Sequence, residues 1–440
     1  MKRRQFVYTS VLFTAGCAAS VSDRAAVQAL QADPDGILDL PPGFQYSIIS
    51  RAGDTMSDGL LTPARPDGMA AFAAPDGQIA LVRNHENLAG QHALGAFGAN
   101  LERLPSVDKR FFYDYGDGEM PGMGGTTTLL YDPKSGKVSK SYLSLAGTEL
   151  NCAGGPTPWG TWLSCEECFD PATLKRTRHI PREKQHGYVF EVDPLAGEIQ
   201  EPLPLPALGR FIHEAAAIDA KTGTVYLTED WRDGLLYRCV PNEPGKLSQG
   251  GQLQALAFVD EQLTDTANYS ADQRIAVGEW NAVRWINVDG ADTEDNDLRL
   301  RGQAKGAARF VRGEGIWYQD GLIAFTCTEG GADRNGQIFL YRSTDDNLGE
   351  LKLLVEAAAD SPMHNADNLS FTPWGDLIVC EDRSENCGLY LLKLDGSYTQ
   401  FAYHRASRSE LAGVCFAPDG KTLFVNIQDI GLTLAITGPF

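Results

Sequence analysis

Two segments of this chain repeat one another, and they decide the fold. The first is Thr157-Pro-Trp-Gly-Thr-Trp-Leu-Ser-Cys-Glu-Glu167, and the second is Thr372-Pro-Trp-Gly-Asp-Leu-Ile-Val-Cys-Glu-Asp382. Six of the eleven positions are identical, and the last position keeps its carboxylate. Each segment indicates a tight turn followed by an apolar strand, because Gly accepts the positive φ of such a turn without steric cost. Internal repeats of this kind are typical of architectures built from one supersecondary unit.

Looser copies of the same hairpin occur four more times, as two apolar strands around a Gly turn with a polar or acidic end. These copies span Met69–Glu86, Ala215–Asp230, Ile316–Glu329 and Val414–Asp429. Together the six hairpins place their turn glycines at positions 77, 160, 223, 321, 375 and 420. Near-equivalent hairpins favour radial repetition over a β-sandwich, so the sequence predicts an all-β, six-bladed β-propeller.

Several consecutive turn glycines are further apart than the roughly 40–50 residues that one blade needs. The stretches Ala89–Gly125 and Asp260–Ala307 are therefore expected to be loop excursions between blades. The acidic run Asp292–Asp297 lacks calcium-loop spacing and is interpreted as a solvated loop. No helix of convincing periodicity interrupts the pattern, so residues 31–440 are predicted to form one propeller domain.

The first 30 residues have the features of a bacterial export signal and a linker. A basic start is followed by the apolar run Val7–Ala15 and by small residues. The pair Arg3-Arg4 fits the twin-arginine variant, which predicts a periplasmic or extracellular protein. The segment Thr14–Cys17 resembles a lipobox with Thr in place of the usual Leu, so a lipid anchor stays open. The sequence after the N-terminus contains no apolar run of about 18 residues, so it predicts no transmembrane helix.

Charge and cysteine content narrow the function further. The net charge of −20 argues against a nucleic-acid partner, because phosphate backbones require basic surfaces. The nine cysteines of an exported protein leave disulfides open, Cys380 with Cys387 among them. Four cysteines in apolar strand-like runs fit buried small hydrophobic residues equally well, namely Cys239, Cys327, Cys380 and Cys415. The single Cys165-Glu-Glu-Cys168 motif is weak evidence for a zinc site, since no second pair accompanies it.

Polar residues gather at one end of every hairpin, where the first strand starts and the second strand ends. If the hairpins are the inner parts of the blades, these residues converge on one mouth of the channel. Carboxylates so close together require cations, and one thiolate among them indicates a transition metal such as iron beside Ca²⁺. The residues are Asn84–Glu86, Asn151-Cys152, Glu166-Glu167, His213-Glu214, Glu229-Asp230, Arg312–Glu314, Glu329, His364–Asn368, Glu381-Asp382, Glu410 and Gln428-Asp429.

Eight segments of this chain also carry a resemblance to a known family. They are Val82–Glu86, Asn151–Gly155 with Thr157–Glu167, Gly209–Ala215, Arg312–Glu314, Asp367–Leu369, Cys415–Gln428 and Ala435–Phe440. Together they span nearly the whole chain beyond its N-terminus, and they resemble the PhoX-type alkaline phosphatase family. The resemblance implies a six-bladed propeller that holds Fe³⁺ and Ca²⁺ and hydrolyses small phosphomonoesters outside the cytoplasm. We expect a monomer.

The resemblance also implies individual roles for matching residues. Cys152 matches an iron-ligating thiolate, Glu167 a carboxylate ligand, Glu214 and Glu314 iron or calcium ligands, and Asp367 a calcium ligand. Arg312 matches a phosphate clamp, while Asn84 and His85 are expected to line the phosphate pocket.

The residues themselves leave two other functions open. A calcium-dependent lactonase or esterase on a six-bladed propeller would use the same acidic mouth but would not need a thiolate ligand. A non-catalytic propeller would use metals for structure and its rim for a partner, since propellers have both roles.

Overall fold

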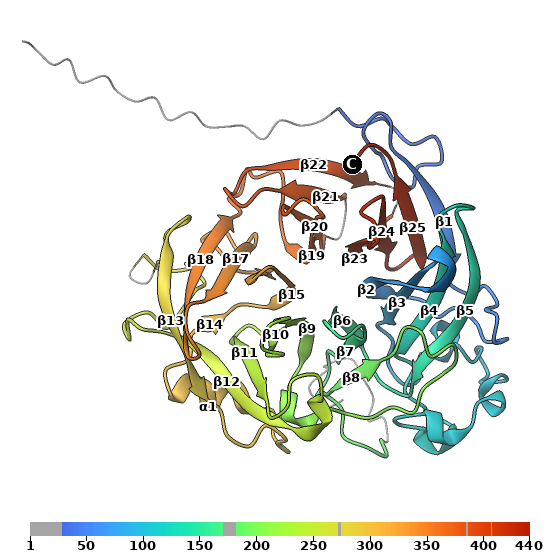
Figure 1. Ribbon diagram of the computed structural model, residues 1–440, viewed down its shortest axis with the longest axis horizontal. Helices are drawn as coiled ribbons and strands as arrows, with labels where there is room; N and C mark the ends of the chain where they lie inside the picture. Colours follow the sequence, from blue (N-terminus) through green and yellow to red (C-terminus); the bar gives the residue numbers. More distant parts are fainter. Residues whose placement is uncertain (1–28, 170–181, 272–273, 384–385, 406) are drawn as a thin grey trace, which may run out of the picture.

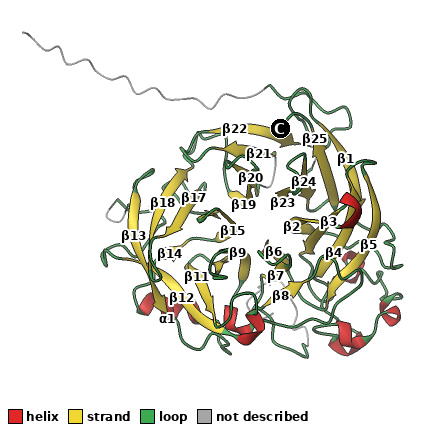
Figure 2. Ribbon diagram, viewed as in Figure 1, coloured by secondary structure: helices red, strands yellow, loops and turns green. Residues whose placement is uncertain are grey.

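The computed structural model describes residues 29–169, 182–271, 274–383, 386–405 and 407–440. Strands β1 to β25 dominate these residues and surround a central axis in a propeller-like ring (Figure 1). The α-helix α1 (Leu298–Ala304) and the 3₁₀ turns lie outside the central strands (Figure 2). The prediction of an all-β, propeller-like fold is confirmed. Within the described residues, no helix is long and apolar enough to cross a membrane.

Six innermost strands surround the axis, and each forms an antiparallel hairpin with the strand that follows it (Figure 1). The predicted hairpins are therefore present, and their six turn glycines have φ between 69° and 94°. The innermost strands are β2 (Pro66–Ala73), β6 (Asn151–Pro156), β9 (His213–Ile218), β15 (Gly313–Gln319), β19 (Ala366–Phe371) and β23 (Leu411–Phe416). Their partners are β3 (Ile79–His85), β7 (Trp162–Glu166), β10 (Val225–Glu229), β16 (Leu322–Cys327), β20 (Leu377–Glu381) and β24 (Thr422–Ile427).

Three hairpins extend outward into four-stranded sheets, and the β6–β7 hairpin extends into a three-stranded sheet with β8 (Val189–Val192). The added strands are β4 (Gly125–Asp132), β5 (Lys137–Ala146), β21 (Cys387–Leu392), β22 (Tyr398–His404) and β25 (Leu432–Thr437). The N-terminal strand β1 (Gln45–Arg51) pairs with β25. This pairing closes the ring, because it ties the first described strand to the last one (Figure 1).

The other two hairpins share one ten-stranded sheet, so the described chain forms five hydrogen-bonded sheets rather than the six separate blades expected. Strand β13 (Trp280–Asn287) pairs with β12 (Gly251–Phe258) on one side and β18 (Leu348–Glu356) on the other. Strand β13 lies within Asp260–Ala307, a stretch that the sequence analysis predicted to be a loop excursion. An inserted strand satisfies the outer edges of both hairpins, which would otherwise expose unpaired N–H and C=O groups. The remaining members are β11 (Gly234–Pro241), β14 (Arg309–Phe310) and β17 (Gln337–Ser343).

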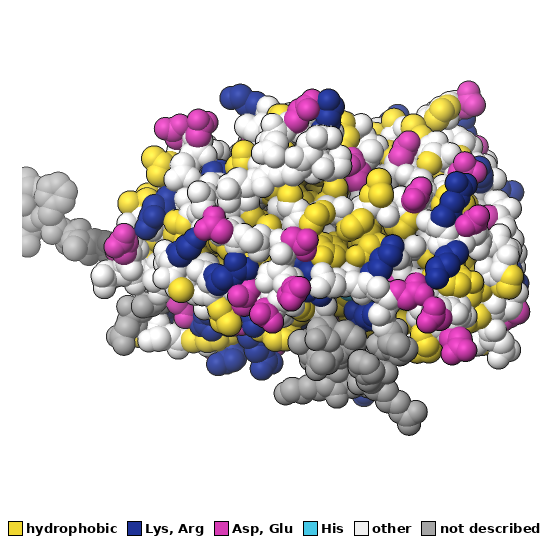
Figure 3. Space-filling view, turned by 90° about the horizontal axis from the view of Figure 1, so that it is seen from below, with side chains coloured by type: hydrophobic (Ala, Val, Ile, Leu, Met, Phe, Trp, Pro, Cys, Tyr) yellow, Lys and Arg dark blue, Asp and Glu magenta, His cyan; other side chains and the backbone are white. Residues whose placement is uncertain are grey.

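Apolar side chains fill the space between neighbouring sheets. One cluster packs Leu163 of β7 and Val189 of β8 against Leu227 of β10 and Tyr237 of β11. The four cysteines predicted to be buried are buried, and all eight cysteines of the described residues are free. Acidic and basic side chains are interspersed on the side of the ring seen in Figure 3, so the negative charge forms no single patch there.

The innermost strands approach one another so closely that they require Gly at their contacts. A Cβ atom on Gly155 would lie 1.8 Å from the carbonyl oxygen of Ala216 in the next innermost strand. We expect Gly155→Ala to lower the free energy of unfolding by about 3 kcal/mol, because backbone must move to relieve the clash. Thermal unfolding followed by circular dichroism measures the effect. Gly160→Ala is the control: its Cβ would meet nothing within 4 Å, so only the positive φ costs about 1 kcal/mol.

Candidate active site

A repeated irregularity builds the site: the strand register shifts near the start of all six innermost strands. Such a bulge inserts an extra residue and re-aims its side chain. The second residue of five innermost strands lies in this irregular part, while in β23 the shift begins one residue later. Five of the six positions carry an acid or a thiol, and the sixth carries Ala: Asp67, Cys152, Glu214, Glu314, Asp367 and Ala412.

A second set of polar residues follows the end of each partner strand. In five of the hairpins, the backbone N–H of this residue donates to the carbonyl of the residue just before the innermost strand. This bond draws the end of one strand to the start of the other, so the two sets lie together. The second set is Glu86, Glu167, Asp230, Thr328, Asp382 and Gln428.

The two sets form overlapping clusters with potential ligand atoms within 4.8 Å of one another. Glu214 belongs to two of them, which links the predicted residues into one group. The clusters are Cys152–Glu167–Glu214, Glu214–Glu314–Asp367 and Asp67–Glu86–Glu410. All five residues expected to bind metal are therefore brought together at one mouth of the channel.

The cluster is electrostatically unfavourable without positive charge. Burial raises the pKa of Glu214 well above its usual range, and the charges of Glu314 and Glu167 raise it further. The pKa of the Cys152 thiol rises for the same reasons, through burial and then the charges of Asp67 and Glu214. Such groups ionise together only when cations compensate them.

Glu214 shows that the residues fit a cation. Its side chain is 0% exposed. Among the described residues, neither Oε1 nor Oε2 of Glu214 has a hydrogen-bond partner. Buried carboxylates are normally paired or hydrogen-bonded. Two unsatisfied oxygens beside a thiol and further carboxylates are therefore a donor set of the kind that hard and intermediate cations take.

Arg312 lies beside this cluster, immediately before β15. Its Nε and Nη2 donate to the two carboxylate oxygens of Asp230 at 2.8 and 2.7 Å, and Nη2 lies 3.3 Å from Glu314. Its Nη1 lies 3.9 Å from Glu329, beyond hydrogen-bonding distance. The residue has φ of 53°, in the left-handed region that side chains rarely adopt. The backbone and Asp230 thus hold the guanidinium in one orientation.

A cavity of about 380 Å³ opens in front of Arg312. On the opposite side of the cluster, the channel is filled by apolar residues such as Met69, Ile316 and Trp317, which leave a cavity of only about 10 Å³. A ligand therefore reaches the cluster from the mouth. The larger cavity is lined by Glu167, Ile212, Asp230, Trp231, Arg232, Arg312 and Glu329.

Asn84 and His85 are not brought to this cavity, contrary to the expectation for them. The amide of Asn84 donates to the carbonyls of Cys152 and Ala153 and accepts from Trp162 and Ser164. The ring nitrogens of His85 contact the Ala64 carbonyl and the Thr127 hydroxyl. Strand alternation explains the difference for His85: neighbouring side chains point to opposite faces, and it is the next residue, Glu86, that joins the cluster.

The same alternation divides the paired acids. Glu166, Glu229 and Glu381 end their strands on the other face. Each accepts a backbone N–H from the start of the following strand or, for Glu166, from Gly187 just before it. The sequence analysis placed both members of each pair at the mouth. The structure places Glu167 and Asp230 on the cavity and gives their neighbours a structural role.

The sequence analysis did not single out Asp67, which occupies the same position on β2 as Glu314 does on β15. The signal was present: Arg65-Pro-Asp-Gly68 matches Arg312-Gly-Glu-Gly315. Both arginines have left-handed φ, 50° and 53°. The sequence analysis placed Asp230, the partner of Arg312, among the mouth residues but gave it no role.

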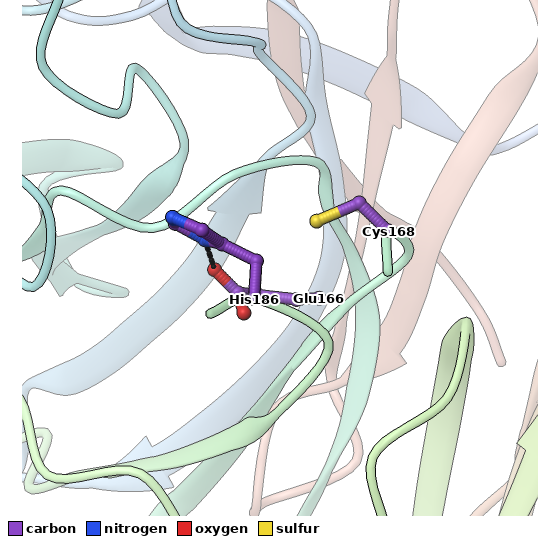
Figure 4. Close-up of side chains that lie close together, drawn as sticks. All are labelled: Glu166, Cys168 and His186. Carbon is purple, nitrogen blue, oxygen red and sulfur yellow. Dashed lines mark hydrogen bonds and ion pairs between the residues drawn. The ribbon is translucent and has the colours of Figure 1, made fainter. Parts of the chain in front are cut away.

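A separate group, Glu166, Cys168 and His186, also has ligand atoms within 4.8 Å (Figure 4). The dashed line in the figure is the 2.6 Å contact between His186 Nδ1 and Glu166. The other ring nitrogen lies 3.4 Å from Asp114. Both nitrogens face carboxylates, which favours the doubly protonated ring, and that form has no lone pair for a metal. The group is an ion network that supports the strand end next to Glu167.

This network makes stability depend on pH. Burial alone would lower the pKa of His186. The charge of Glu166 and the hydrogen bonds with Asp114 and Glu166 outweigh this effect of burial and raise the pKa to about 9. Other charged or titratable groups near it are Glu149, Arg182, Cys168 and Tyr113. The stabilisation is fully present below about pH 6.5 and is lost as the pH rises through about 9.

We expect the wild type to lose up to about 3 kcal/mol more of unfolding free energy than His186→Gln between about pH 6 and about pH 10. Urea unfolding of both proteins at the two pH values measures the difference. An equal loss in the two proteins would contradict the charged state of His186.

The fold and the cluster of buried acids define a class of protein. It is a propeller-like protein that has acidic side chains and a thiol suited to cations at the mouth of its channel, beside the oriented Arg312. A family model described as alkaline phosphatase PhoX matches residues 25–110 and 119–431. The chain therefore belongs to the PhoX alkaline phosphatase family, and it is a phosphoric monoester hydrolase. The family is metal-dependent and acts outside the cytoplasm.

The chain is also similar to solved structures. The chain resembles PhoX from Pseudomonas fluorescens, solved in complex with vanadate, a transition-state analogue, with 20% identity and a TM-score of 0.66. That match covers 94% of this chain and 97% of the other. A virginiamycin B lyase from Staphylococcus aureus is 13% identical, with 90% and 99% covered and a TM-score of 0.41. A gluconolactonase from Xanthomonas campestris is 12% identical, with 91% and 98% covered and a TM-score of 0.38. No curated protein matches the chain.

Proposed function

We propose that the chain hydrolyses phosphomonoesters at the mouth of its channel, where the buried acids and Cys152 hold metal ions. The unsatisfied carboxylate of Glu214 carries this proposal, because a buried charged group without a partner requires a cation. Cys152, Glu167, Glu214, Glu314 and Asp367 are the proposed ligands. Asp67, Glu86 and Glu410 form a further acidic group around the same mouth.

We propose Fe³⁺ and Ca²⁺ as the ions. A thiolate suits a transition metal such as iron, while a surplus of carboxylate oxygens suits Ca²⁺. When bound, such cations supply Lewis acidity that polarises the phosphoryl group and compensates its negative charge.

The remaining steps belong to residues of the chain. Arg312 binds a phosphoryl oxygen through the guanidinium edge that Asp230 leaves free, and it stabilises charge that develops during transfer. Asp230 is a positioning residue that fixes the direction of the fork. The apolar residues beneath the cluster, among them Trp317, limit access of water from the other end of the channel.

The architecture proposed around this site is a six-bladed propeller spanning residues 31–440 as a single domain. Counting the ten-stranded sheet as two blades joined through β13 gives six, and six bulged innermost strands support that count. The proposed twin-arginine signal within residues 1–30, with a lipid anchor as the alternative, lies almost wholly in residues 1–28, outside the described residues. We propose a monomer exported to the periplasm or the cell exterior.

Elemental analysis combined with activity assays tests the proposal. The purified protein is expected to contain iron and calcium and to hydrolyse phenyl phosphate but not a lactone. Calcium without iron, together with lactone hydrolysis, would favour the lactonase alternative. A metal-loaded protein that is inactive on both substrates would favour a non-catalytic propeller.

A further inference from the structure

The cavity in front of Arg312 is larger than a phosphoryl group needs. Its volume of about 380 Å³ falls near the lower end of the roughly 300–1,000 Å³ that is typical of pockets for small organic ligands. Arg312, Asp230 and Glu167 form the polar part of the lining, while Ile212 and Trp231 form an apolar part. A phosphoryl group held at Arg312 therefore leaves room for the organic part of the ester beside Trp231.

Trp231 is held in place before any ligand binds. Its carbonyl accepts the backbone N–H of Arg312 at 2.9 Å, so the two residues are joined directly. The Arg299 guanidinium lies 5.2 Å from the centre of the indole ring, and Arg299 is itself bound to Asp233 at 3.0 Å. A preorganised aromatic ring binds a ligand without losing much conformational freedom.

The charge of the lining next to Trp231 is compensated. Arg232 contacts both carboxylate oxygens of Glu329 at 3.2 Å. The two charges offset one another next to Trp231, although the Arg232 side chain is 78% exposed, so this part of the lining has no net charge that favours an ionic leaving group over an uncharged one. An uncharged ring is the leaving group that fits an indole and an isoleucine side chain.

We infer that Trp231, with Ile212, is a leaving-group subsite that makes the enzyme selective for phosphomonoesters of uncharged aromatic alcohols. The inference rests on the proposed function of Arg312 and the adjoining cluster. Trp231 determines specificity here and takes no part in the transfer itself.

The test compares phenyl phosphate with ethyl phosphate in metal-loaded protein. Trp231→Ala is expected to raise KM for phenyl phosphate about tenfold, with kcat and the KM for ethyl phosphate changed less than about twofold. Trp231→Phe should retain most of the preference, because it keeps an aromatic ring. Trp374→Ala is the matched control and should change neither substrate, since this 48% exposed tryptophan lies in a hairpin turn outside the cavity.

Inhibition constants give a reading that does not depend on turnover. In Trp231→Ala, the Ki of phenylphosphonate should rise about tenfold while the Ki of inorganic phosphate stays unchanged. Equal effects on both substrates and both inhibitors, or no effect on either pair, would overturn the subsite. A wild-type protein inactive on both esters would instead overturn the proposed function on which the subsite rests.

Discussion

Replacing Arg312 by Ala is expected to lower kcat/KM for a phosphomonoester by about 1,000-fold. The guanidinium is the fixed cation of the chain at the cavity, and the Asp230 carboxylate holds two of its nitrogens. Removing it leaves the developing charge on the phosphoryl oxygens without a preorganised donor. Since that charge is greatest in the transition state, we expect most of the loss in kcat rather than in KM.

Two further variants separate charge from geometry. Arg312→Lys keeps the positive charge but not the planar fork that Asp230 holds, so it should recover no more than about tenfold of the lost activity. The left-handed φ of this position costs Ala and Lys the same, so backbone strain does not distinguish them. Arg342→Ala is the control, because this arginine pairs with Glu350 on an outer strand and should keep full activity. Activity of Arg312→Ala within about tenfold of wild type would contradict the clamp.

Replacing Glu214 by Gln is expected to lower activity by at least about 100-fold and to reduce the bound iron and calcium. The same change should have opposite effects on the stability of the metal-free and the metal-bound protein. Without metal, the variant should be at least as stable as wild type, since it removes a buried carboxylate that has no partner. With metal, the wild type should melt at the higher temperature, because ligand binding stabilises the folded state.

Elemental analysis and thermal melts with and without a chelator measure both effects. Glu381→Gln is the matched control: this carboxylate is also buried, but it accepts the N–H groups of His364 and Gly388 and stands apart from the cluster. It should melt earlier in both states and keep its metal. Unchanged metal content in Glu214→Gln would contradict the assignment of Glu214 as a ligand.

Much of the scaffold was predictable because hairpins are local. A Gly with positive φ between two apolar strands is determined by residues a few positions apart, and all six predicted turns are present. The gathering of acids at one end also follows from hairpin geometry, which brings the start of one strand beside the end of the next. This reasoning correctly placed Glu167, Glu214 and Glu314 together.

Errors arose wherever register or pairing between distant segments decided the outcome. Bulges at the start of each innermost strand determine which side chain joins the cluster, and an apolar pattern does not reveal a bulge. Asp67 was missed although its segment resembles that of Glu314. His85 and Glu166 were placed on the wrong face for another reason: strand alternation turns them away from their neighbours Glu86 and Glu167. Strand β13 was missed because its partners, β12 and β18, exist only once two hairpins lie side by side.

The sequence by itself determined the repeat, the six Gly turns and the acids with one thiol that end at one mouth, because these depend on short-range turn chemistry and strand alternation. Only the tertiary structure decided which acids share one cluster, how Asp230 directs Arg312, and that Trp231 stands beside it. Those features depend on distances between residues far apart in the chain, and such distances are set when the ring closes and the blades pack together.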